Sequence, residues 1–204
     1  MTELITAFTF GLGAGVAPGP LQAVVITSTL QRGFGAGWRV AMGPLITDAP
    51  IVTLSVAVLS SVPDGVLNGL AVAGGIVLIG LGMWELRSRR AEAAEHETSP
   101  GGADLLRGAV VNLLNPHPWI FWIGAGGPLV VSAWRRGPGL ALGVLAIFYG
   151  LLIGLKVVTA WLVARGGARL TEQWRGRLVV AGAALLILGG TFVAWQGAGG
   201  SFTA

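Results

Sequence analysis

Residues 4–31 read LITAFTFGLGAGVAPGPLQAVVITSTLQ, and no charged side chain lies between Glu3 and Arg32. A helix of about 20 apolar residues crosses the hydrocarbon layer of a membrane, which is about 30 Å thick. This stretch is therefore long enough to span a membrane. Its middle holds Pro18-Gly19-Pro20, and two prolines so close together predict a break in the helix.

The rest of the chain repeats this pattern. Only 11% of the 204 residues are charged and 53% are hydrophobic, whereas about 25% of the residues in a soluble domain are charged. Such stretches have no polar face to show to water, which excludes a soluble helical bundle. We therefore expect an all-α polytopic membrane protein with six transmembrane helices. The five further charge-poor stretches are 40–61, which holds only Asp48, 65–84, 108–134, 137–164, which holds only Lys156, and 178–204.

Arginines in the connections predict the orientation. Cytoplasmic loops of membrane proteins carry an excess of lysine and arginine. The first, third and fifth connections hold ten arginines, and the opposite side holds two, so we expect the odd loops in the cytoplasm and both termini outside. The same loops, lying beside anionic lipid, explain the basic balance without nucleic-acid binding. The ten are Arg32, Arg39, Arg87, Arg89, Arg90, Arg107, Arg165, Arg169, Arg175 and Arg177, and the two are Arg135 and Arg136.

The chain divides into two halves within one transmembrane domain, 1–204. Half-repeats 1–86 and 107–204 flank a polar linker, 87–106, and three spans per half make the second half enter the membrane from the opposite face. Each half has a Pro-X-Pro in its first span and one charge in its second span. We therefore expect two inverted three-helix repeats, with helices 1 and 4 broken at Pro-X-Pro.

The breaks and the two charges indicate a site near the middle of the membrane. Backbone groups freed by a break must be buried in protein or line a cavity. Asp48 lies nine residues after Arg39 and Lys156 nine before Arg165, so each is about 13 Å from the cytoplasmic edge. Equal depth predicts a buried ion pair, which either clips two spans together or handles substrate. The candidate substrate-binding residues are Pro18, Gly19, Pro20, Gln22, Asp48, Asn112, Asn115, Pro116, His117 and Lys156.

These residues resemble the LysE/RhtB family of amino-acid exporters, within the wider LysE superfamily. Four features carry the resemblance: Pro18-Gly19-Pro20, Arg32-Gly33, Asp48 and Asn115-Pro116. It implies an exporter of amino acids or related metabolites in the bacterial plasma membrane, driven by the proton gradient. Two positions depart from the family pattern, since Thr47 replaces a frequent glycine and His117 replaces the usual lysine.

A zwitterionic substrate needs a site for each of its charges. Half-helix N-termini at Pro20 and Pro116, together with Lys156, suit a carboxylate. Asp48 suits an ammonium group or a coupling proton, and His117 is a second candidate for proton coupling. Asn115 is placed to cap the half-helix that begins at Pro116. We expect no cofactor, no metal site and no catalytic residue.

Other functions stay open at this level. The same superfamily includes inorganic cation exporters, and lipid export or a non-transporting membrane scaffold are further alternatives. An enzyme is disfavoured because no motif supports a nucleophile and the chain has no cysteine. Small-residue spacings predict close helix packing, either within one subunit or in a homodimer. They are Gly11/Gly15, Gly139/Gly143 and Gly150/Gly154.

Overall fold

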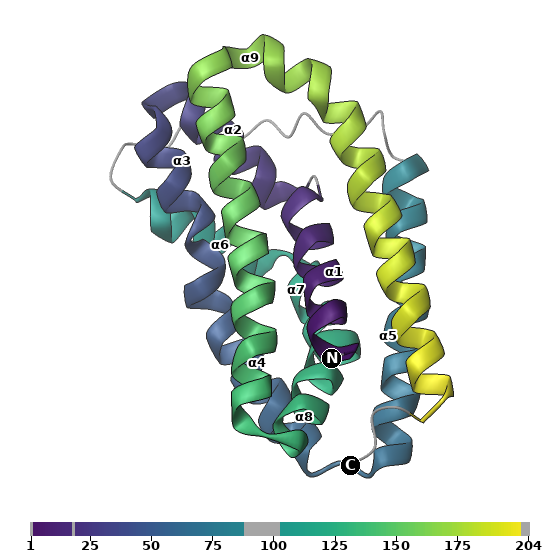
Figure 1. The fold of residues 1–204 in the computed structure, drawn as a ribbon. Helices are drawn as coiled ribbons and strands as arrows, with labels where there is room; N and C mark the ends of the chain where they lie inside the picture. The colour runs from purple at the N-terminus through teal and green to yellow at the C-terminus, as the bar shows by residue number, and fades with distance from the viewer. Residues whose placement is uncertain (1, 18, 88–102, 201–204) are drawn as a thin grey trace.

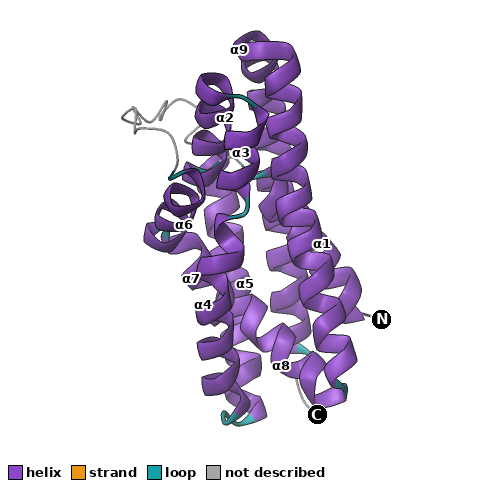
Figure 2. Ribbon diagram, turned by 90° about the vertical axis from the view of Figure 1, so that its left-hand side faces the viewer, coloured by secondary structure: helices purple, strands orange, loops and turns teal. Residues whose placement is uncertain are grey.

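A computed structural model describes residues 2–17, 19–87 and 103–200, and these residues are helical throughout apart from short turns (Figures 1 and 2). The predicted all-α class is confirmed for this part of the chain. In chain order the helices are α1 (Thr2–Val16), α2 (Pro20–Arg32), α3 (Phe34–Ala41), α4 (Gly43–Ser60), α5 (Asp64–Arg87), α6 (Asp104–Leu114), α7 (Pro116–Phe121), the π-helix η1 (Trp122–Gly126), α8 (Gly127–Arg136) and α9 (Pro138–Ala198).

Four helical segments are long and apolar enough to cross a membrane, as a polytopic membrane protein requires. A fifth candidate is the pair α1 and α2, which meet at an angle of 52°. The predicted fourth span, 108–134, is divided among α6, α7, η1 and α8 and does not form one long helix. The four segments are Phe34–Ser60, Asp64–Trp84, Pro138–Gly166 and Val180–Ala198.

Both helix breaks occur where the prolines predict them. Between α1 and α2, Gly19 is extended with φ −155° and Pro20 is the first residue of α2, while Pro18 lies outside the described residues. The second break falls at Asn115, so both Pro116 and Pro118 belong to α7. Proline is tolerated there because N–H groups in the first turn of a helix have no partner within the helix.

Helix α9 is an arch that organises the other helices. Its two arms run along the bundle in Figure 1, with α1 between them and α5 against the second arm. Glycine permits the contact with α1, because a Cβ at Gly11 would lie 2.8 Å from the carbonyl oxygen of Phe148. Gly150 and Gly154, by contrast, face open space, so that spacing does not mediate packing within the described subunit.

The two groups of connections lie at opposite ends of the bundle. The turn from α2 to α3 and the bend of α9 lie at the top of Figure 1, whereas α8 and the last turns of α9 lie in its lower part. Figure 2 shows the same elongated bundle from the side, with α6 and α7 on the face opposite α1. Polar side chains between these ends are therefore enclosed by apolar helices.

Candidate functional site

Asp48 is the buried acid of α4, and its side chain is held by the second half of the chain. Only 3% of the residue is exposed. The Nδ2 group of Asn112, on α6, donates to Oδ1 at 2.6 Å, and the hydroxyl of Tyr149, on α9, donates to Oδ2 at 3.1 Å. The indole of Trp122 also lies close to the carboxylate. All of these partners are neutral, so they satisfy the oxygens without cancelling the charge.

Thr47 explains how Asn112 is oriented toward the acid. The Nδ2 group of Asn112 also donates to Thr47 Oγ1 at 2.8 Å, and Thr47 Oγ1 in turn donates to the carbonyl oxygen of Gly43 at 3.3 Å. The departure from the glycine that is frequent in the resembled family thus supplies an acceptor. Thr47 and Asp48 together fix the Asn112 amide.

Lys156 is the buried base of α9, with 4% of the residue exposed. Its Nζ donates to Oε1 of Gln22 at 3.2 Å. Gln22 is the third residue of α2, which begins at Pro20, so this contact lies in the first turn of a helix. The N-terminus of a helix carries a partial positive charge. Lys156 and this helix end together favour an anion.

Lys156 and the residue of α9 that contacts Asp48 lie along one face of that helix. Tyr149, which contacts Asp48, and Lys156 are seven residues apart, which places them on the same side of the helix about 10 Å from each other along its axis. The contacts described here join Asp48 to Asn112 and Tyr149 and Lys156 to Gln22, and the ion pair between Asp48 and Lys156 stays a prediction. The groups around the Asp48 carboxylate are uncharged, and they come from neighbouring helices and from Thr47 on α4 itself.

Each helix break adjoins one of the two charges. Gln22 follows the first break by one turn, and Asn112 precedes the second break by one turn. The predicted cap is confirmed, because Asn115 Oδ1 accepts from the backbone N–H of His117 at 3.1 Å. His117 is half-buried and is not among the partners of Asp48. The proposed roles of Gly19, Pro116 and His117 stay predictions.

Aromatic rings fill the centre of the bundle beside Asp48. Phe121 and Phe148 are stacked with centroids 5.1 Å apart, and Trp122 is stacked on Tyr149 at 6.1 Å. The cavity that Phe121, Trp122 and Phe148 border together with Phe10 measures about 10 Å³. Such a space holds about one water molecule. This cavity is therefore smaller than an amino acid.

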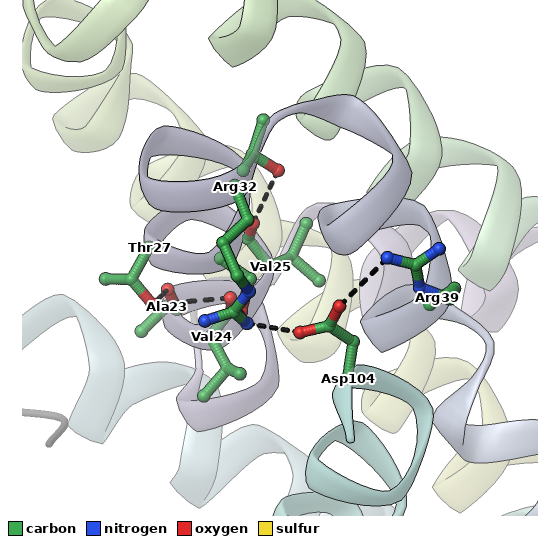
Figure 3. Close-up of polar contacts among 9 residues, drawn as sticks. Ala23, Val24, Val25, Thr27, Arg32, Arg39 and Asp104 are labelled. Atoms are coloured by element: carbon green, nitrogen blue, oxygen red, sulfur yellow. Dashed lines mark hydrogen bonds and ion pairs between the residues drawn. The ribbon is translucent and has the colours of Figure 1, made fainter. Parts of the chain in front are cut away.

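Ion pairs join helices near both ends of the bundle. At one end, Arg32 and Arg39 both contact the carboxylate of Asp104, the second through Nη2 and Oδ2 at 3.2 Å (Figure 3). At the other end, Arg135 pairs with Asp64 and Arg136 pairs with Glu3. Loop charge indicated the topology role of these arginines but not the acids that they contact.

Comparison with known proteins shows the family of this chain. The family described as LysE type translocator matches residues 13–196. The chain belongs to this family. It is also 31% identical over 186 residues to an uncharacterized membrane protein of Pseudomonas aeruginosa, which covers 86% of this chain and 84% of that protein. No solved structure matches the chain. The chain is therefore a membrane protein of a family of transporters.

Neither Tyr149 nor Trp122 was among the predicted site residues of this LysE-type translocator. Tyr149 is the single tyrosine of the chain and lies two helical turns before Lys156. That spacing was a readable signal, because a polar ring on the same helix face as a buried lysine must also point inward. Trp122 carried no comparable signal, since its direction depends on the π-helix η1.

Proposed function

We propose that this LysE-type translocator is a secondary-active exporter of amino acids or related small metabolites across the bacterial plasma membrane, coupled to protons. Six membrane spans, formed by two inverted three-helix repeats with both termini outside, complete the proposal. One observation carries it. Two opposite charges, Asp48 and Lys156, are buried between apolar helices and held by neutral dipoles on the facing half.

The chemistry of these contacts favours a zwitterion. An ionised group buried in a membrane is costly, and such groups usually mark a substrate or ion pathway. The neutral amide and hydroxyl around Asp48 leave its negative charge available to a substrate ammonium group. Lys156 and the first turn of α2 offer a positive site to a carboxylate.

Proton coupling follows from exchange at the acid. In this proposal Asp48 binds either the substrate ammonium group or a proton, and His117 is a second proton carrier. Inward movement of protons then drives substrate out. The half-helix ends at Pro20 and Pro116 adjoin the two contacts and extend the proposed site, as do Gly19, Asn112 and Asn115.

Counterflow in proteoliposomes tests this function. Vesicles loaded with each member of a panel of unlabelled amino acids are diluted into labelled amino acid, with the pH set separately inside and outside. We expect uptake of label for a subset of amino acids and a dependence of net flux on an imposed pH gradient. Empty vesicles and vesicles carrying the Asp48→Asn variant are the controls. No counterflow with any amino acid would contradict the proposal.

Two outcomes separate the alternatives. Flux of an inorganic cation with no amino-acid counterflow would favour a cation exporter of the same superfamily. Amino-acid counterflow that ignores the pH gradient would keep the substrate class and remove proton coupling. The panel therefore tests the substrate and the energy source independently.

A further inference from the structure

The ion pairs at the two ends of the bundle have the same construction. The inner latch is the contact of Asp104, the first residue of α6, with Arg32 and Arg39 (Figure 3). The outer latch is the contact of Glu3, in the first turn of α1, with Arg136. Both acids are nearly completely buried, at 2% and 6% side-chain exposure.

The two latches are reciprocal between the halves of the chain. In the inner latch, an arginine that ends the first broken span contacts the acid that begins the second broken span. In the outer latch, an arginine that ends the second broken span contacts the acid that begins the first. In the structure α6 begins at Asp104, three residues before the predicted start of the second half-repeat. Each latch therefore joins a helix of the first half to a helix of the second, at opposite ends of the bundle.

The sequence around the two arginines repeats as well. Ser28-x-x-x-Arg32-Gly33 ends α2, and Ser132-x-x-x-Arg136-Gly137 ends α8. Both glycines have positive φ, 82° and 155°, which stops each helix directly after its arginine. Both serines are buried one turn before the arginine. The same Ser-x-x-x-Arg-Gly motif thus occurs once in each half, and the arginine of each copy contacts an acid in the other half.

We infer that these latches are the two gates of the transport cycle, and that they open in alternation. The inference rests on the proposed export function. Both latches are closed in this structure. The cavity among the aromatic rings at the centre measures about 10 Å³, and a hollow of about 240 Å³ lined by Arg32, Asp104 and Arg107 lies at the inner latch. Rocking one half against the other separates the groups at one end while it presses together those at the other end. Opening of the inner latch admits substrate, and opening of the outer latch releases it.

Single cysteines report each gate without competing thiols, because the chain contains no cysteine of its own. The Ser28→Cys background also loses a hydroxyl that accepts from Arg32 Nη2 at 3.3 Å, so every rate is compared with that of the same single-cysteine parent. Ser28→Cys places a thiol behind the inner latch, and Ser132→Cys places one behind the outer latch. The rate of modification by a bulky hydrophilic maleimide is measured in nanodiscs, where both ends of the protein meet the reagent. The measurement needs no substrate.

Each latch is then opened by a neutral replacement of its acid. We expect Asp104→Asn to raise the modification rate at position 28 by about fivefold or more and not to raise it at position 132. Glu3→Gln is expected to do the reverse. Rates that rise at both reporters, or at neither, would overturn the inference.

Asp64→Asn is the matched control for the outer latch. Asp64 pairs with Arg135, the neighbour of Arg136, at the same end, but its side chain is 42% exposed. Exposed ion pairs contribute little, so we expect less than about a twofold change at either reporter. An effect as large as that of Glu3→Gln would assign the gating to general charge loss at this end and contradict the latch.

Two further variants keep the test decisive if an acid replacement prevents folding. Arg39→Gln removes the half-exposed arginine of the inner latch, and Arg136→Gln removes the arginine of the outer latch. We expect the same reciprocal pattern, weaker for Arg39→Gln because Arg32 still contacts Asp104. Reciprocal labelling in a protein without amino-acid counterflow would sustain the gates and reject the proposed substrate. Counterflow without reciprocal labelling would do the opposite.

Discussion

Asp48 and Lys156 are both buried and carry opposite charges, yet they are held differently. The Asp48 carboxylate receives hydrogen bonds from two helices, α6 and α9, with the Trp122 indole close by. The contact of Lys156 with Gln22 joins two long side chains, at the first turn of α2. Asp48 lies in the first half of the chain and its contacts Asn112 and Tyr149 in the second, whereas Lys156 lies in the second half and its contact Gln22 in the first.

The difference indicates separate tasks for the two groups. Side chains of packed helices donate to the Asp48 oxygens, whereas the contact between Lys156 and Gln22 joins two side chains with several rotatable bonds each. We interpret Asp48 as the fixed end of the site and Lys156 as the adaptable end. Substitutions at the fixed end should therefore reduce transport most.

The first and largest effect is expected from Asp48→Asn. This change keeps the shape of the side chain and removes the charge that pairs with a substrate ammonium group or a proton. A charge-assisted hydrogen bond contributes about 1.5–3 kcal/mol, so the counterflow rate should fall by about 100-fold. The rate in proteoliposomes at matched protein content is the measurement. Asp64→Asn makes the same chemical change at a half-exposed acid, and we expect it to retain the rate within about twofold. Equal rates in both variants would remove Asp48 from the site.

The second effect, from Lys156→Met, tests the adaptable end. Methionine keeps most of the apolar stem and removes the positive charge, so we expect the rate to fall by about tenfold. Competition with the amide of the transported amino acid sharpens the comparison. In the parent protein the amide should compete poorly because it lacks a carboxylate, whereas in Lys156→Met the acid and the amide should compete alike. Retained preference for the acid would place the carboxylate elsewhere.

Much of this arrangement was predictable from the sequence, and the exceptions have physical causes. Apolar length and the prolines predicted the helices and both breaks, since these are local effects. The contacts of Asp48 were not predictable, because they depend on how α6 and α9 pack against α4. Equal sequence distance from the flanking arginines suggested an ion pair with Lys156, but the residue of α9 that contacts Asp48 is Tyr149, about 10 Å from Lys156 along the helix axis. Hydropathy likewise places Arg32 and Arg136 at an end of the bundle without indicating their partners.

The third effect tests whether Tyr149 supports the fixed end. Tyr149→Phe removes only the hydroxyl that donates to Asp48, and the ring keeps its stacking on Trp122. One hydrogen bond contributes about 1 kcal/mol, so we expect a loss of about fivefold in counterflow. The melting temperature in detergent should fall by about 2–4 °C. A fall in melting temperature with full transport would assign Tyr149 to packing alone.

The smallest effect is expected from Thr47→Val, which separates the position of Asn112 from the charge of Asp48. The Asn112 amide donates both to the Thr47 hydroxyl oxygen and to the Asp48 carboxylate. Valine keeps the branched shape of threonine and removes the first of these two acceptors. The bond from Asn112 to the carboxylate remains, so counterflow should stay within about twofold and the melting temperature should fall by about 1–3 °C. Thr53→Val, on the exposed side of the same helix, removes only a bond to the carbonyl oxygen of Ala49 and is the control. If Thr47→Val reduces transport as strongly as Tyr149→Phe, the geometry of the Asn112 amide matters as much as a direct contact to the acid, and the fixed end of the site extends to Thr47.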